Sequence, residues 1–79
     1  MMDITVYFKD GKLGYTYTLD NGSKVLDLKR AIAKDNRTPL HDQSVEKFFI
    51  AGYPYSPGSS VLNDNTQLEE EKEYYAAQQ

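Results

Sequence analysis

The sequence contains no cysteine among its 79 residues, which excludes both a disulfide framework and a metal site built from thiolates. It also lacks a long apolar run, since none approaches the roughly 20 residues that a membrane-spanning helix needs. The N-terminal stretch MMDITVYFKD carries an acidic residue early and no basic region, so it is not a secretory signal peptide. We therefore expect an intracellular protein, cytoplasmic and/or nuclear, that does not bind membranes.

The chain has no basic excess either. Its formal net charge is −3, and its seven lysines are scattered along the sequence. Nucleic-acid binding depends on clustered lysine and arginine side chains that neutralise phosphates. The sequence therefore predicts no nucleic-acid partner.

Groups that carry catalysis or bind metals are equally sparse. His41 is the one histidine and lies in a polar stretch without a second histidine or a cysteine, so we expect no metal site there. The acidic run Glu69 to Glu73 is interrupted by Lys72 and is typical of a solvated turn. The serines of the loop, Ser56, Ser59 and Ser60, have no base near them in sequence. We therefore predict no enzyme activity and no cofactor.

Seventy-nine residues provide one domain with a single small core. Apolar and polar residues alternate from Met2 to Lys9, which predicts a half-buried strand. Asp10-Gly11 follows and is a strong signal for a tight hairpin turn. The second strand, LGYTYTLD, would place one set of side chains on one face: Leu13, Tyr15, Tyr17 and Leu19.

A helix is predicted over residues 24–35. Ser23 is a suitable N-cap, and Val25, Leu28 and Ile32 recur at helical spacing. The polar face would carry Lys29, Arg30 and Lys34. Asn36 is suited to a left-handed C-cap, and Pro39 prevents continuation.

The second half predicts strands over 45–52 and 70–77, separated by an irregular loop with two prolines and by a turn with a short helical element over 61–68. One helix then covers one face of a mixed four- to five-stranded sheet, an α+β roll. The predicted core comprises Ile4, Val6, Val25, Leu28, Ile32 and Phe48. We expect Tyr53 and Tyr55 to be structural, with Tyr55 packed under the loop of Pro54 and Pro57.

The order and spacing of several short matches resemble ubiquitin and its relatives, the β-grasp family, from Met2 to Ala77. The matching positions are Met2, Ile4 and Val6; Asp10-Gly11-Lys12; Val25, Leu28 and Ile32; Pro39; Phe48-Phe49-Ile50-Ala51-Gly52; and Leu62-Asn63-Asp64. The resemblance implies a ubiquitin-like domain over 2–77, with 78–79 beginning a tail or linker.

Family members that become conjugated end in Gly-Gly, whereas this sequence ends EYYAAQQ. The resemblance therefore implies a non-conjugated module that docks proteins through the outer face of its sheet. Transferred residue by residue, that face comprises Phe49, Gly52, Tyr75 and Ala77, with Lys9 and Lys47 at its edge. The partners implied are ubiquitin receptors, the proteasome or segregase-type ATPases.

Two alternatives stay open. One is a ubiquitin-like modifier whose Gly-Gly tail is absent from this sequence. The other is a β-grasp oligomerisation or scaffold domain that pairs through opposite charges. Such pairing needs an acidic motif and a basic cluster; Glu69 to Glu73 could form the acidic motif, but Lys9 is the only basic residue of the first strand. We expect a monomer.

Overall fold

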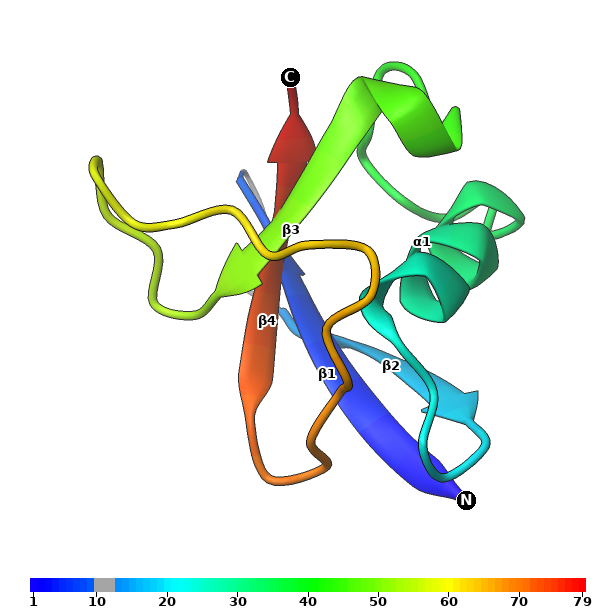
Figure 1. The fold of residues 1–79 in the computed structure, drawn as a ribbon. Coiled ribbons are helices and arrows are strands. Elements are labelled where there is room, and N and C mark those ends of the chain that lie inside the picture. Colours follow the sequence, from blue (N-terminus) through cyan, green and yellow to red (C-terminus); the bar gives the residue numbers. More distant parts are fainter. Residues whose placement is uncertain (10–12) are drawn as a thin grey trace.

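The chain folds into a mixed sheet with a helix packed across one face (Figure 1). The computed structural model describes residues 1–9 and 13–79. Within these residues the elements are β1 (Met2–Phe8), β2 (Tyr15–Leu19), α1 (Val25–Ala33), the 3-10 helix η1 (Val45–Lys47), β3 (Phe48–Gly52) and β4 (Glu73–Gln78). The predicted α+β roll is confirmed, with four strands in the part of the chain that is described.

The strand order is β2-β1-β4-β3. The two central strands, β1 and β4, run parallel, and each pairs antiparallel with an outer strand. The register places Tyr7 beside Tyr75 and Phe49 beside Ala77. The predicted Asp10-Gly11 turn lies outside the described residues.

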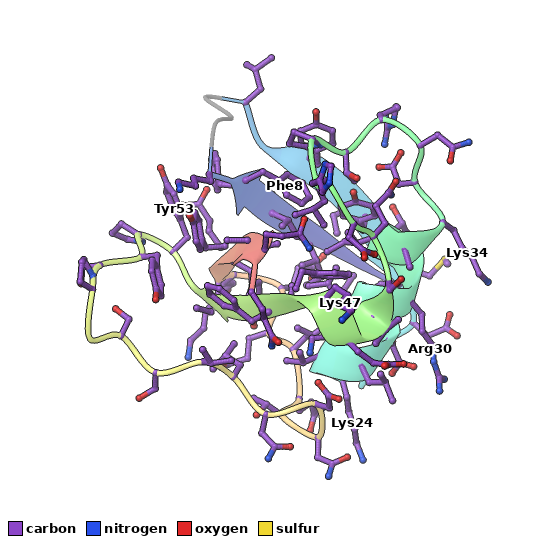
Figure 2. All side chains as sticks on the ribbon, turned by 90° about the horizontal axis from the view of Figure 1, so that it is seen from above. Phe8, Lys24, Arg30, Lys34, Lys47 and Tyr53 are labelled. Atoms are coloured by element: carbon purple, nitrogen blue, oxygen red, sulfur yellow. The ribbon has the colours of Figure 1, made fainter. Side chains whose placement is uncertain are left out.

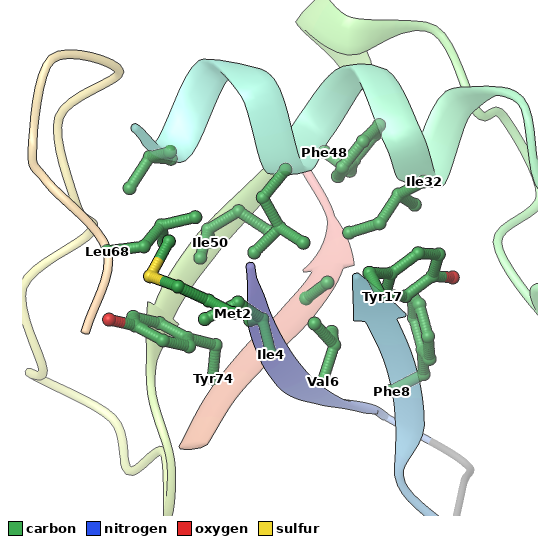
Figure 3. Packing of buried hydrophobic residues seen from close by; sticks show 13 residues of the cluster. Met2, Ile4, Val6, Phe8, Tyr17, Ile32, Phe48, Ile50, Leu68 and Tyr74 are labelled. Atoms are coloured by element: carbon green, nitrogen blue, oxygen red, sulfur yellow. The ribbon is translucent and has the colours of Figure 1, made fainter. Parts of the chain in front are cut away.

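The core lies between α1 and the inner face of the sheet (Figure 3). The predicted alternation of β1 is confirmed, because Met2, Ile4, Val6 and Phe8 are all buried. All six predicted core residues are fully buried: Ile4, Val6, Val25, Leu28, Ile32 and Phe48. Beyond these six, the core includes Phe8, Ile50, Leu68 and Tyr74.

The second strand begins later than predicted. Tyr17 is buried and Tyr15 and Leu19 pack against the core, but Leu13 precedes β2 and is 79% exposed. Gly14 explains part of this difference. A Cβ on Gly14 would lie 2.6 Å from the Thr5 Cγ2 atom and 3.3 Å from the Tyr7 ring, so the chain passes close over β1 at this glycine.

The helix is also shorter than predicted, and its caps differ. Its N-cap is Lys24 rather than Ser23, and the Asp27 carboxylate accepts a hydrogen bond from the Lys24 amide at 2.9 Å. The carbonyl of Ser23 accepts from the Leu68 amide, which ties the chain before the helix to the segment before β4. Asn36 does not adopt the left-handed conformation, because no described residue other than glycine has a positive φ. The C-cap is Lys34.

Lys29 was expected to face solvent with Arg30 and Lys34. Those two are exposed, but Lys29 is buried, and its Nζ atom lies 2.9 Å from Asp64 Oδ1. Position 29 is four residues after Val25 and lies at the margin of the apolar stripe. The aliphatic stem therefore packs along the core while the ammonium group reaches a carboxylate.

The second half is less regular than predicted. Residues 45–47 form η1, so β3 starts only at Phe48. Residues 61–68 form a turn and isolated bridges to Ala51 and Lys24 instead of a helical element. The last strand begins at Glu73 and continues through Gln78. The Gln78 side chain donates to the carbonyls of Asp42 and Lys47, which joins this end of the chain to the domain.

Candidate functional site

Five aromatic side chains gather on the sheet face that α1 does not cover. Phe49 and Tyr75 point outward from β3 and β4, and Tyr7 points outward from β1 between the buried Val6 and Phe8. Tyr53 and Tyr55 come from the loop after β3, which lies on the side of the sheet away from α1 (Figure 1). We call Tyr7, Phe49, Tyr53, Tyr55 and Tyr75 the aromatic face.

The rings are in mutual contact. Tyr53 stacks on Tyr7 with centroids 4.1 Å apart and planes 20° apart. Tyr55 stacks on Tyr75 at 4.8 Å and 5°. Phe49 lies 5.6 Å from Tyr55 and 6.3 Å from Tyr75, tilted against both. Because Tyr7 and Tyr75 are register partners, the stacked pairs lie on adjacent strands.

The loop is fixed at its base and turns at its tip. At the base, the Tyr53 amide donates to the Glu73 carbonyl at 3.1 Å. At the tip, the Ser59 amide donates to the Ser56 carbonyl at 2.9 Å, and Gly58 has a φ of 95°. Proline at the second position and a positive-φ glycine at the third are the signature of a type II turn. Residues 53–55 lie between these two points, and the rings of Tyr53 and Tyr55 stack on the outer face of the sheet.

A polar contact orients one of these rings. The Tyr7 hydroxyl donates to the Glu73 carboxylate at 2.8 Å. This hydrogen bond, with smaller contributions from desolvation and the carboxylate charge, raises the pKa of Tyr7 above its ordinary value. Tyr7 therefore remains neutral and keeps its ring under that of Tyr53.

The resemblance to ubiquitin-like proteins predicted several residues on this outer face, and they contribute unequally to it. Phe49 and Tyr75 are half-buried within the aromatic face. Ala77 points to the same side but is only 7% exposed, so it offers little contact area. The expected place of Gly52 on this face is wrong. Gly52 is exposed at the end of β3, but its register partner is the buried Tyr74, so by strand alternation it faces the α1 side.

Lys9 and Lys47, which were predicted at the edge of this face, are exposed and lie toward one end of the sheet. Lys9 follows β1 and lines, with Ala77 and His41, a hollow of about 180 Å³. Lys47 precedes β3, where its carbonyl accepts from the Gln79 amide. Figure 2 shows a separate basic group, Lys24, Arg30 and Lys34, on the helix side, with Tyr53 on the opposite side of the molecule.

The described residues offer little else for chemistry. They contain no group of three or more histidine, cysteine, aspartate or glutamate side chains placed to hold a metal ion. In residues 1–9 and 13–79, no helix has the length and apolar character needed to cross a bilayer. On the aromatic face Tyr53 is exposed, and the other four rings are half-buried.

Sequence reasoning did not assign Tyr7, Tyr53 and Tyr55 to this face. For Tyr7 a signal was available, since strand alternation places it opposite Val6 and Phe8. The two loop tyrosines follow Gly52 in an irregular segment, where no periodicity exists. We expected Tyr55 to pack under the prolines, and the structure places its ring against Tyr75 and Phe49.

Comparisons with known proteins rest on the fold. No model of a known protein family matches the sequence, and no curated protein is significantly similar to it. Among solved structures, the chain is similar to the UBL domain of Plasmodium falciparum Dsk2, with a TM-score of 0.60 and 23% sequence identity. The similarity covers 99% of this chain and 100% of that chain.

The chain has the ubiquitin-like β-grasp fold. The similarity extends over nearly the whole of both chains, and the mixed sheet with one helix fits this fold. In this chain, the loop after β3 lays the rings of Tyr53 and Tyr55 over the outer face of the sheet.

Proposed function

We propose that the protein is a ubiquitin-like interaction module that docks other proteins through the aromatic face and has no enzyme activity. The observation that carries the proposal is the gathering of five aromatic side chains on the sheet face away from α1. The core is complete without Phe49, Tyr7 or Tyr53. Tyrosine and phenylalanine are enriched in protein interfaces, where they supply large contact areas at low entropic cost.

The lysines at one end of the face support the same function. Lys9 and Lys47 are exposed, and they flank β1 and β3 at the same end of the sheet, where they add positive charge. Charges at an interface rim speed association and orient the partner more than they add affinity. This arrangement suits a partner whose apolar anchor is flanked by acidic residues.

For the partner class we propose proteins of the ubiquitin–proteasome system: ubiquitin receptors, the proteasome or segregase-type ATPases. The resemblance of the sequence to ubiquitin-like proteins supports this class. We further propose that the module acts as a monomer in the cytoplasm and/or nucleus, where proteins without disulfides are stable in reducing conditions.

Chemical-shift mapping tests the docking face. The isotope-labelled protein is titrated with a ubiquitin-receptor motif, and we expect shifts concentrated on β3, β4 and the loop of Tyr53 and Tyr55. Phe49→Ala and Tyr75→Ala should each weaken binding by about 1–3 kcal/mol, the scale of interface hot spots. Lys34→Ala, on the exposed helix side, is the matched control and should leave affinity unchanged.

An amide spectrum of each variant establishes that it is folded before its affinity is interpreted. Shifts confined to α1, or equal losses of affinity in Phe49→Ala and Lys34→Ala, would contradict docking through the aromatic face. Absence of binding to any ubiquitin-receptor motif would overturn the proposed partner class.

A further inference from the structure

A serine or threonine precedes a proline at two positions of this chain, and the structure gives the two residues different exposure. Thr38 precedes Pro39, and Ser56 precedes Pro57. Thr38 is half-buried, and its Oγ1 atom is buried without a hydrogen-bond partner among the described residues. Ser56 is exposed at the start of the turn at the loop tip. Only Ser56 therefore presents its hydroxyl to an enzyme.

A serine followed by proline is the minimal substrate of proline-directed protein kinases. A pocket that accepts the proline ring leaves no partner for the amide hydrogen that any other residue would carry there, and an unpaired buried N–H is costly. The loop can also reach an active site. Within the described residues, the hydrogen bonds of residues 54–60 join Ser56 and Ser59 to each other. The Ser59 amide donates to the Ser56 carbonyl, the Ser56 amide donates to Ser59 Oγ, and the two hydroxyl oxygens lie 3.3 Å apart. Opening that turn breaks no backbone hydrogen bond of the sheet.

We propose that Ser56 is a phosphorylation site for a proline-directed protein kinase, and that the phosphate loosens the packing of Tyr55 on the aromatic face. In the transfer, the Ser56 oxygen forms a bond to the γ-phosphorus of MgATP while the bond from that phosphorus to the β–γ bridging oxygen breaks. ADP leaves, and the serine proton passes to a carboxylate of the kinase.

The coupling to the aromatic face follows from the position of Tyr55. Tyr55 immediately precedes Ser56, and its ring covers Tyr75 and part of Phe49. A phosphoserine carries roughly −1.5 to −2 charges near pH 7 and is strongly hydrated. The segment from Phe48 to Glu71 contains no lysine or arginine, so the loop itself supplies no ion-pair partner for the phosphate. In the unmodified turn the Ser56 Oγ atom lies 3.3 Å from the Ser59 Oγ atom, to which the Ser56 amide also donates. A phosphate on Ser56 displaces this contact, and the opened turn releases the adjacent Tyr55 from its packing.

Phosphorylation would uncover Phe49 and Tyr75. An effect on partner binding therefore rests on the proposed docking function, whereas phosphorylation of Ser56 does not depend on that function. Both measurements below are made on the protein alone, so they can fail while docking is confirmed, or succeed while docking is refuted.

The first measurement is phosphate incorporation into the folded chain by a purified proline-directed kinase with MgATP, followed by site mapping with mass spectrometry. A Ser-Pro peptide establishes that the kinase is active. We expect one phosphate, on Ser56, abolished by Ser56→Ala and slowed about tenfold or more by Pro57→Ala. Ser60 is exposed in the same loop without a following proline and serves as the internal control. No incorporation, modification of Thr38 or Ser60 instead, or an unchanged rate for Pro57→Ala would overturn the site.

The second measurement is the position of the Tyr75 ring resonances. A ring stacked at 4.8 Å shifts the protons of its neighbour strongly, so loss of the stack is visible directly. In fully phosphorylated protein we expect the Tyr75 resonances to move toward their positions in Tyr55→Ala. Resonances that remain at their unmodified positions would refute the loosening of Tyr55.

Discussion

Phe48 and Phe49 are adjacent in the sequence, yet the sheet gives them opposite environments. Phe48 is fully buried between the sheet and α1, whereas Phe49 lies half-buried on the aromatic face. The consecutive phenylalanines therefore divide between the two layers of the molecule, one in the core and one on the surface that we propose docks partners.

Truncating the two rings should separate stability from binding. We expect Phe48→Ala to lower the free energy of unfolding by about 3–5 kcal/mol, the range for a buried phenylalanine. Phe49→Ala loses only its contacts with Tyr55 and Tyr75 and should cost about 1 kcal/mol. Urea unfolding of both variants measures the difference. Equal losses would mean that the strand register is wrong.

A second residue-scale prediction concerns Asp35, whose side chain is 10% exposed. Its carboxylate accepts hydrogen bonds from the Arg37 guanidinium at 2.9 Å and from the Tyr17 hydroxyl at 2.7 Å. These bonds, those to Arg37 foremost, hold the pKa of Asp35 far below its ordinary value against the opposing effect of burial. The ionised carboxylate joins the end of α1 to β2.

Because the folded-state pKa of Asp35 is lowered, its contribution to stability is complete above the unfolded pKa of roughly 3.9 and is lost as the pH falls toward the folded value. Asp35→Asn should therefore be less stable than the wild type at pH 7. The difference between the two free energies of unfolding should narrow below about pH 4. Urea titrations from pH 7 to pH 2 provide the test, and a difference that is independent of pH would refute this role.

At the scale of elements, the helix begins where the long-range contacts allow it to begin. Ser23 has a favourable capping side chain, but its backbone pairs with Asp20 and Leu68. The helix therefore starts one residue later, and Asp27 supplies the cap from within its first turn. An acidic group there also interacts favourably with the helix dipole.

The cap yields a matched pair of variants. We expect Asp27→Ala to destabilise the protein by about 1 kcal/mol, because it removes both the hydrogen bond to the Lys24 amide and the charge at the helix start. Ser23→Ala should have a much smaller effect, since no capping bond of its side chain is lost. Thermal unfolding measures the stability of the two variants. A larger loss of stability for Ser23→Ala than for Asp27→Ala would show that Ser23 caps the helix.

At the scale of the whole molecule, one core joins every element. The Cα radius of gyration is 11.2 Å, close to the roughly 11.6 Å expected for a compact chain of this length. Leu28 and Ile32 from α1 meet Ile4, Val6 and Ile50 from the sheet, and all are fully buried (Figure 3). A protein this small has no second core that would hold part of it together.

We therefore expect cooperative two-state unfolding and a large effect of Leu28→Ala. The substitution should cost about 2–5 kcal/mol, which approaches the whole stability of so small a domain. Near- and far-ultraviolet circular dichroism should give coincident unfolding curves for the wild type. A cost below about 1 kcal/mol, or curves that separate, would mean that α1 does not close the core as described.

Local sequence patterns determined most of the architecture. Alternation in β1 and helical spacing of Val25, Leu28 and Ile32 fix which side of each element is apolar, and only one layered arrangement buries both sides. The outward direction of Phe49 followed from strand alternation together with the resemblance to ubiquitin-like proteins. These features were predictable because each depends on residues within about one element of one another.

The tertiary structure alone decided the rest. Lys29 is buried because Asp64 arrives from the turn before β4, and η1 replaces the start of the predicted third strand. Tyr53 and Tyr55 join the aromatic face because their rings stack on Tyr7 and Tyr75, which become neighbours only when β1 and β4 pair in the sheet. Side-chain spacing encodes the faces of regular elements, but the place of a loop residue depends on the surface available once those elements have packed.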